Sequence, residues 1–107
     1  MGEQSKAAGV GTVGLVGLGL MGRGIAACLL SHGMRVVAFN RTAERARKAR
    51  EFIANAMDEV VARGVAEAET VADWAERFTI VPAIDGLAEC PFVVESVKED
   101  IVLKRDL

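Results

Sequence analysis

The chain has 107 residues, of which 51% are hydrophobic and 26% are charged, and its formal net charge is −2. This composition predicts one soluble domain with a small core, and the charge gives no indication of binding to nucleic acid or to an anionic membrane. No apolar run approaches the roughly 20 residues that cross a membrane. Cys28 and Cys90 lack both metal-ligand spacing and a disulfide framework. We expect no metal and a cytoplasmic location, with an organelle matrix as the alternative, and residues 1–11 as a flexible tail.

A glycine-rich segment at residues 17–22 organises the predicted fold. It reads Gly-Leu-Gly-Leu-Met-Gly, follows an apolar run at residues 12–16 and precedes a helical pattern at residues 23–32. A strand, a tight glycine turn and a helix in this order are what a dinucleotide-binding βαβ unit requires. The turn's unpaired N–H groups and the positive end of the helix dipole would then bind a pyrophosphate. The alternative is a plain tight turn, which this flanking context disfavours.

Each glycine of this segment has a separate expected role. Gly17 permits a sharp exit from the strand, Gly19 has no Cβ to block a pyrophosphate, and Gly22 lets the helix lie close to the sheet. We expect the turn to bind the cofactor through these glycines and through two residues between them, Leu20 and Met21.

The second predicted strand, at residues 35–40, ends at the position that selects the cofactor. An acidic residue about 20 positions past the glycines usually binds the adenosine ribose, but Asn40 stands here and is followed by Arg41 and Thr42. An amide does not repel a 2′-phosphate, and Arg41 could pair with one through its planar guanidinium. This pattern favours NADP over NAD. Alternatively, Asn40 or Thr42 only caps the next helix and Arg41 is solvated.

The remaining predicted elements form a partial α/β sheet with a helical arm. We expect an apolar face on the first helix, formed by Met21, Ile25, Cys28 and Leu29. Cys28 is therefore interpreted as a buried structural thiol. Helical patterns at residues 43–63 and 67–78 predict an arm in which Trp74 packs between the two helices.

Apolar runs at residues 79–82 and 92–97 predict two further strands, and residues 99–107 predict the start of a helix. Topology rules then suggest the strand order 3-2-1-4, with parallel strands and right-handed crossovers. The glycine turn and the end of the fourth strand would meet at the switch point, where ligands bind in such sheets.

The sequence resembles the N-terminal part of the L-3-hydroxyacyl-CoA dehydrogenase family, which includes 3-hydroxybutyryl-CoA dehydrogenases. Residues 16–26 read VGLGLMGRGIA, close to the family's IGAGxMGxGIA, and residues 92–104 read FVVESVKEDIVLK, close to its LVIEAVxENLxLK. In this family a long helix pair between the second and third strands forms an arm that contributes to the CoA site. The resemblance covers nearly all of residues 12–107 and implies a partial Rossmann-type domain of about four parallel strands, with the arm at about residues 43–78.

The resemblance also implies roles for individual residues. The glycines would hold the pyrophosphate of NAD or NADP, and Asn40 replaces the Asp that is common in the family. Arg63 falls near a basic position that meets the CoA moiety. Four positions line the nicotinamide half of the cofactor site, namely Ser96, Val97, Glu99 and Lys104. Glu99 could equally be an N-terminal charge on the last helix, and Lys104 a solvated residue.

The family's catalytic His–Glu pair, its NTS segment and its helical dimerisation domain have no counterpart in residues 1–107. We therefore expect no catalytic residue in this chain, which would supply the cofactor half of a 3-hydroxyacyl-CoA dehydrogenase and be inactive alone. The full-length protein would bind acyl-CoA and form a homodimer. Alternatives are a non-catalytic NAD(P)-sensing module, a structural relative such as a lens crystallin, and a fragment of a 3-hydroxyisobutyrate-type dehydrogenase. That last family shares residues 17–22 and 40–42 but lacks the long arm.

Overall fold

The computed structural model describes residues 11–97 and 100–105, so the predicted N-terminal tail and Glu99 lie outside the described residues except for Gly11. Five strands form one sheet in the order β3-β2-β1-β4-β5. The strands are β1 (Thr12–Val16), β2 (Arg35–Phe39), β3 (Phe78–Val81), β4 (Phe92–Val97) and β5 (Asp100–Arg105). The helical elements are α2 (Leu20–Ser31), α3 (Ala43–Ala62), α4 (Ala68–Val71) and the 3-10 turns η1 (Trp74–Arg77) and η2 (Ile84–Leu87).

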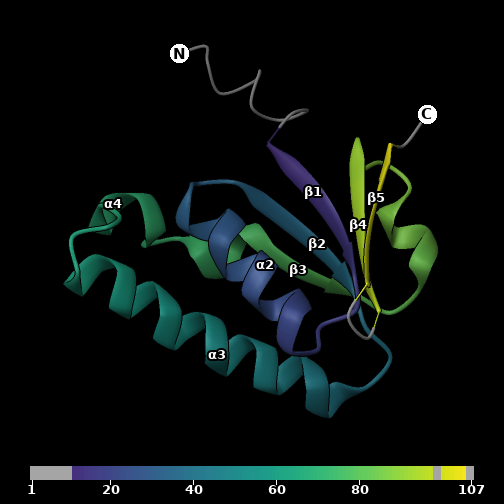
Figure 1. Ribbon diagram of the computed structural model, residues 1–107, viewed down its shortest axis with the longest axis horizontal. Coiled ribbons are helices and arrows are strands. Elements are labelled where there is room, and N and C mark those ends of the chain that lie inside the picture. The colour runs from purple at the N-terminus through teal and green to yellow at the C-terminus, as the bar shows by residue number, and fades with distance from the viewer. Residues whose placement is uncertain (1–10, 98–99, 106–107) are drawn as a thin grey trace.

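The first four strands are parallel, and their order confirms the predicted topology. Their carboxyl ends converge where the chain leaves β1 for α2 and β2 for α3 (Figure 1). β1 lies at the centre, paired with β2 on one side and β4 on the other. The end of the central strand therefore becomes the switch point of the sheet, with the glycine turn directly after it.

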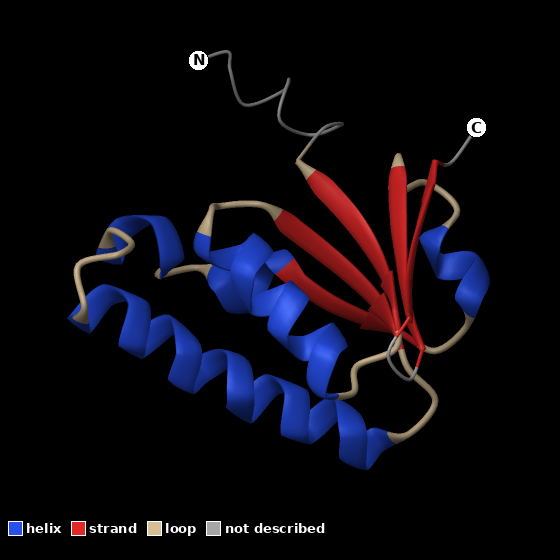
Figure 2. Ribbon diagram, viewed as in Figure 1, coloured by secondary structure: helices blue, strands red, loops and turns tan. Residues whose placement is uncertain are grey.

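The main core lies between the sheet and the two long helices, which cover the same face (Figure 2). Apolar β-branched and aliphatic residues of β1 and β2 meet the inner sides of α2 and α3, as expected for a sheet buried by crossover helices. The core consists of Leu15, Leu18, Ala26, Ala27, Leu30, Val36, Ala38, Ala49, Ile53, Met57, Val71 and Phe78.

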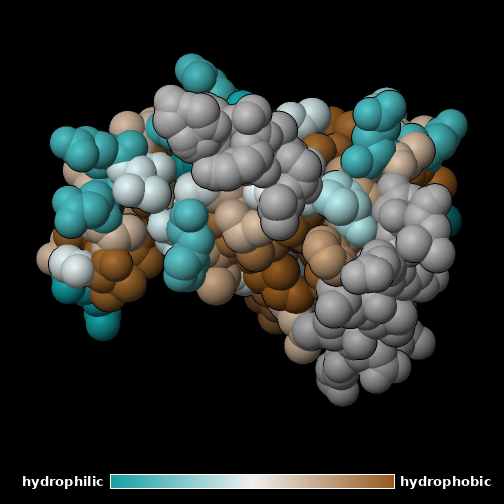
Figure 3. Space-filling model, turned by 90° about the horizontal axis from the view of Figure 1, so that it is seen from above, coloured by the Kyte–Doolittle hydropathy of each residue, from teal (hydrophilic) through white to brown (hydrophobic). Residues whose placement is uncertain are grey.

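The other face of the sheet carries the short η2 segment and the loop after it. Leu87 and Cys90 are buried there. A Cβ at Gly14 would lie 3.1–3.2 Å from atoms of Val93 and Cys90, so this glycine leaves room for Cys90 against β1. Seen from above, hydrophobic residues lie in the middle of the molecule, and the left end carries both hydrophobic and hydrophilic ones (Figure 3).

The buried face of α2 differs from the predicted one. The residues that the structure buries are Gly22, Ala26, Ala27 and Leu30. Cys28 is exposed, so its interpretation as a buried thiol is wrong, and the side chain of Met21 is also exposed. Small residues spaced four apart let the helix approach the sheet closely, because no long side chain separates the two backbones. The larger Ile25 and Leu29 then flank this contact and are only partly buried.

The first helix of the predicted arm forms as expected. α3 begins after Thr42, whose side chain accepts a hydrogen bond from the Arg45 backbone N–H at 3.2 Å, so the capping role considered for Thr42 is present. The helix ends at Ala62, and Gly64, just after the C-cap Arg63, takes a positive φ of 75° that a side chain would strain.

The second predicted helix, at residues 67–78, is broken into α4 and η1. It also ends one residue earlier than predicted, because Phe78 already belongs to β3, where it pairs with Val36 and is buried. Trp74 packs partly buried against the core, and its ring centroid lies 6.3 Å from that of Phe78. It also lines a hollow with Met57 and Val61 of α3, which fits its predicted packing role.

Residues 100–105 form the antiparallel strand β5 instead of the predicted helix. β5 pairs with β4 from Val97 opposite Asp100 to Phe92 opposite Arg105. The β-branched Ile101 and Val102 favour a strand, and the hairpin satisfies the backbone groups along this edge of β4. The helical pattern and the strand propensity of this segment conflict, and the open sheet edge decides between them.

Arg77 joins three segments at the end of the sheet opposite the glycine turn. Its Nη1 donates to the backbone oxygens of Leu30 and Met34, at 3.2 and 2.7 Å, and its Nη2 donates to that of Thr70 at 2.7 Å. Its Nε donates to Asp73 Oδ1 at 3.0 Å. This side chain is only 9% exposed, so the bonds replace water around a buried cation.

The bond from Arg77 also acts on its acidic partner. The hydrogen bond that Arg77 donates, followed by the attraction of its charge, lowers the pKa of the Asp73 carboxyl below its ordinary value. Asp73 therefore stays ionised to a lower pH than an ordinary aspartate and keeps its bond to the guanidinium there.

Within the described residues, no helix combines the length and the apolar character needed to cross a membrane. In the same ranges, no group of three or more His, Cys, Asp or Glu residues is placed to hold a metal ion.

Replacing Arg77 by Met should lower the free energy of unfolding by about 3 kcal/mol, because three carbonyl groups lose a charged donor. Urea denaturation followed by circular dichroism measures this change. Arg63→Met is the matched control, since Arg63 also pairs with an acid four residues earlier but its side chain is 70% exposed. The control should change stability by less than about 1 kcal/mol. Equal effects of the two substitutions would show that the buried bonds of Arg77 do not hold the arm.

Candidate functional site

The glycine turn begins with a backbone conformation that only glycine adopts easily. Gly17 has a φ of 98° and its N–H donates to the Phe39 oxygen at 3.0 Å. The chain therefore turns sharply away from β1 while still bonded to the end of β2. This confirms the conformational role predicted for Gly17.

Gly19 is the N-cap of α2 and leaves open space where a side chain would lie. A Cβ built on Gly19 would meet nothing within 4 Å. No side chain caps this helix and no acidic residue occupies its first turn. The first N–H groups of α2 and the positive end of its dipole therefore face an open position, which suits a phosphate group.

The two residues between the glycines lie differently. Leu20 is 78% exposed and Met21 is 38% exposed, which is unusual for large apolar residues at the start of a helix. Gly22 is buried against the sheet, as its predicted role requires. Leu18, by contrast, is fully buried and anchors the turn in the core.

Asn40 connects the glycine turn to the loop before α3. Its Oδ1 accepts a hydrogen bond from the Leu18 N–H at 3.3 Å, and its Nδ2 donates to the Thr42 oxygen at 3.0 Å. One acceptor and one donor are used at once, which an amide provides and a carboxylate does not. Asn40 therefore lies beside the glycine turn and also holds that turn in position.

A groove of about 420 Å³ lies next to this turn at the carboxyl ends of β1 and β2. Its lining combines apolar residues from the strand ends with polar and basic residues from the start of α3. The lining residues are Val16, Gly17, Phe39, Asn40, Arg41, Thr42 and Arg45. Such a groove fits a group with an aromatic face and a charged end, as an adenosine phosphate has.

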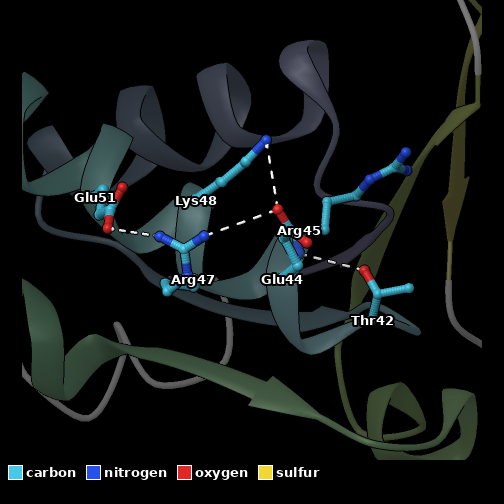
Figure 4. A network of polar contacts seen from close by, with 6 residues as sticks. All are labelled: Thr42, Glu44, Arg45, Arg47, Lys48 and Glu51. Carbon is cyan, nitrogen blue, oxygen red and sulfur yellow. Dashed lines mark hydrogen bonds and ion pairs between the residues drawn. The ribbon is translucent and has the colours of Figure 1, made fainter.

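The charged residues at the start of α3 fall into two sets. In the first set, Glu44 Oε2 lies 3.8 Å from Arg47 Nη2 and 3.7 Å from Lys48 Nζ. Arg47 Nη1 also lies 3.0 Å from Glu51 Oε2. Figure 4 shows this network on one side of the helix, with the Arg45 side chain extending away from it. Sequence reasoning named Arg41 as a candidate but missed Arg45. Arg45 stands three residues after the N-cap Thr42, which places it in the first turn of the helix beside that cap.

The residues predicted for the nicotinamide half are brought together only in part. Ser96 and Val97 lie in the last two positions of β4, just after the pair of Glu95 with Val16 at the end of β1. Lys104 lies in β5 opposite Val93, about 7 Å back along the sheet from that end. The strand conformation of residues 100–105 thus separates Lys104 from the position that the predicted helix would have given it.

Arg63 lies at the opposite end of the arm from the glycine turn. α3 has 20 residues, so Arg63 is about 30 Å along the helix from Thr42. Its guanidinium pairs with Glu59, with an Nη2–Oε2 distance of 2.7 Å, and it is largely exposed. Arg63 therefore belongs to a different surface from the cofactor candidates.

Comparison with known proteins adds the family to this geometry. The 3-hydroxyacyl-CoA dehydrogenase NAD binding domain family matches residues 12–107. The chain belongs to this family. The resemblance seen in the sequence is thereby confirmed, as is the Rossmann-type class of the sheet.

Two curated dehydrogenases and one crystal structure illustrate the relationship. The chain is 35% identical over 98 residues to 3-hydroxyadipyl-CoA dehydrogenase of Escherichia coli (strain K12), an alignment that covers 92% of this chain and 21% of that protein. It is 34% identical over 96 residues to L-carnitine dehydrogenase of Streptomyces griseus, covering 89% and 28%. The crystal structure of (S)-3-hydroxybutyryl-CoA dehydrogenase from Ralstonia eutropha superposes with a TM-score of 0.73 at 27% identity, covering 84% and 32%. The chain thus spans about a fifth to a third of the length of these relatives.

Replacing Asn40 by Asp should lower the free energy of unfolding by about 1 kcal/mol at pH 7, because the carboxylate keeps the bond from Leu18 but faces the Thr42 carbonyl without a proton. The loss should shrink below about pH 4, where a protonated Asp can donate again. Urea denaturation at both pH values tests this. Asn55→Asp, at an exposed position of α3, is the control and should cost less stability than N40D at pH 7, because its carboxylate meets only the solvent-screened charges of Glu51 and Glu59 one turn away. A stability of N40D equal to the wild type at pH 7 would contradict the bridging role of the amide.

Proposed function

We propose that this chain is the dinucleotide-binding part of an oxidoreductase that interconverts 3-hydroxyacyl-CoA and 3-oxoacyl-CoA. The observation that carries the proposal is the open position at Gly19, at the uncapped start of α2 and beside the groove at the strand ends. Membership of the 3-hydroxyacyl-CoA dehydrogenase NAD binding domain family supports it.

The chain's own contribution is binding and orientation. The first N–H groups of α2 would bind the pyrophosphate, and Gly19 leaves the space that the phosphates need. Asn40 holds the turn in that shape, while Val16 and Phe39 offer apolar contacts to the adenosine.

The nicotinamide half of the cofactor belongs to the same proposal. Ser96 and Val97 at the end of β4 would present backbone groups to it. Glu99 and Lys104 stay in the proposal because the family resemblance implies a role for both positions.

The nicotinamide supplies the hydride acceptor or donor when it is bound. The proton of the substrate hydroxyl requires a general base, and none of the residues proposed here has that role. We therefore propose that the chain is inactive alone and that the base comes from a part of the protein beyond these 107 residues.

The same proposal includes an acyl-CoA substrate, a homodimer of the whole protein and a cytoplasmic location. It also includes a role of Arg63 in binding CoA. L-carnitine dehydrogenase is a second candidate for the whole protein, because the chain is about as similar to it as to 3-hydroxyadipyl-CoA dehydrogenase. The matched segment is the cofactor half, where the two kinds of enzyme need the same chemistry.

A non-catalytic NAD(P)-binding module would use the same binding site. The absence of any substrate turnover in the whole protein would distinguish it.

We also propose NADP in preference to NAD. Asn40 carries no negative charge that would repel a 2′-phosphate, and Arg41 lies exposed at the mouth of the groove. The preference is measured as the ratio of the dissociation constants of NADH and NADPH, by titration of the chain with each and detection of nicotinamide fluorescence.

Replacing Gly19 by Ala should weaken binding of both dinucleotides more than tenfold, because the new methyl group would occupy the phosphate position. It should cost about 1 kcal/mol of stability or less, since Ala is only a poorer N-cap than Gly. Gly24→Ala is the matched control, because its Cβ also meets nothing within 4 Å but lies further along α2. The control should bind both cofactors normally and gain about 0.5–1 kcal/mol of stability. Normal binding by a folded G19A variant would refute the pyrophosphate site.

A further inference from the structure

Two arginines at the groove have no charged or aromatic partner among the described residues. The guanidinium groups of Arg41 and Arg45 form no ion pair, hydrogen bond or ring contact within that part of the chain, and both residues are exposed. Their basic neighbours on α3 differ in this respect. Arg47 and Lys48 pair with carboxylates, and Arg50 lies over the Phe78 ring at 5.1 Å. Two positive charges are therefore left at the groove.

The position of Arg45 follows from the way α3 begins. Thr42 accepts a hydrogen bond from the Arg45 N–H at 3.2 Å, so Arg45 lies one turn above the cap and lines the same groove as Arg41 and Thr42. Its side chain extends away from Glu44 and Arg47 (Figure 4). Arg41 precedes the cap and Arg45 follows it, and together they flank the N-terminus of the helix.

The one carboxylate in the first turn of α3 is turned to other partners. Glu44 lies 3.7 Å from Lys48 and 3.8 Å from Arg47. Its charge is thus compensated on the side of the helix away from the Arg45 guanidinium. The helix dipole adds positive potential at the same end, and Asn40 adds an amide where a carboxylate would repel an anion.

We infer that Arg45 acts with Arg41 as the second cation of a phosphomonoester site at the groove, and that this site binds the 2′-phosphate of NADPH. The inference rests on the proposed cofactor function and names the residues that would select between its two cofactors. A phosphomonoester carries a charge of about −1.5 to −2 at pH 7 and has three acceptor oxygens, which matches two planar guanidinium groups. The adenosine ribose of NADH has only hydroxyl groups at this position.

The test is a titration of the chain and of its Arg45→Gln variant with NADH and with NADPH, followed by nicotinamide fluorescence. The wild type should bind NADPH more tightly than NADH. Arg45→Gln should weaken NADPH binding about tenfold and change NADH binding by less than about twofold, because only NADPH loses a charge-assisted bond. The NADPH preference of the wild type should fall as the pH decreases through about 6, where a phosphomonoester takes up its second proton.

Arg47→Gln is the matched control, since it removes the same charge from the same helix at a residue already paired with Glu44 and Glu51. It should leave the affinity for both cofactors within about twofold of the wild type. Circular dichroism confirms that each variant is folded, which is expected because both side chains are exposed.

The outcomes separate this inference from the function on which it rests. If the wild type binds both cofactors and Arg45→Gln weakens them equally or not at all, Arg45 is not a phosphate ligand and the cofactor function stands. A wild type that binds NADH more tightly than NADPH overturns the inference together with the proposed NADP preference, and the dinucleotide-binding function stands. If a folded wild type binds neither cofactor, the proposed function of this chain is wrong and the inference falls with it.

Discussion

A buried guanidinium joins the arm to the sheet beside the hydrophobic core that they share. Arg77 donates to carbonyl oxygens of the end of α2, the start of β2 and the α4 segment, and its Nε bonds Asp73. The end of α2, the loop before β2 and the short helix α4 would otherwise leave these acceptors without donors beside a buried side chain. These bonds hold the chain just before β2, whose pairing with β1 and β3 then carries it to the binding end, where Asn40 follows the strand.

At the binding end, the structure combines a firmly held turn with open space. The turn is held by hydrogen bonds from Gly17 and Leu18 to the end of β2 and to Asn40, and by the packing of Leu18 in the core. Above it, a Cβ on Gly19 would have no neighbour within 4 Å, and α2 has no capping side chain. Donors that are already oriented lose little entropy on binding an anion. Membership of the 3-hydroxyacyl-CoA dehydrogenase NAD binding domain family accords with this arrangement.

Much of the fold could be predicted because its signals are local. Apolar runs mark four parallel strands, glycines mark the turn and the end of α3, and Thr42 marks its start. The predictions were wrong where one sequence pattern fits two different structures. Apolar and small residues both recur at helical spacing in α2, so the sequence could not tell that Gly22 and Ala26, and not Cys28, face the sheet. Residues 100–105 suit a helix by pattern and a strand by propensity, and the edge of β4 decided for the strand.

By itself, the sequence determined the βαβ unit with its glycine turn, the family, and the amide at position 40, because each depends on residues close together in the chain. The tertiary structure alone decided which cations are available at the groove. Arg45, Arg47 and Arg50 look alike in the sequence, but Arg47 meets two carboxylates and Arg50 lies over a ring from a distant strand. Arg45 lines the groove because α3 begins at Thr42 beside the glycine turn. The Arg47 pairs lie within one turn of its own helix, but the ring under Arg50 and the groove beside Arg45 come from segments far apart in the chain, which local residue patterns do not encode.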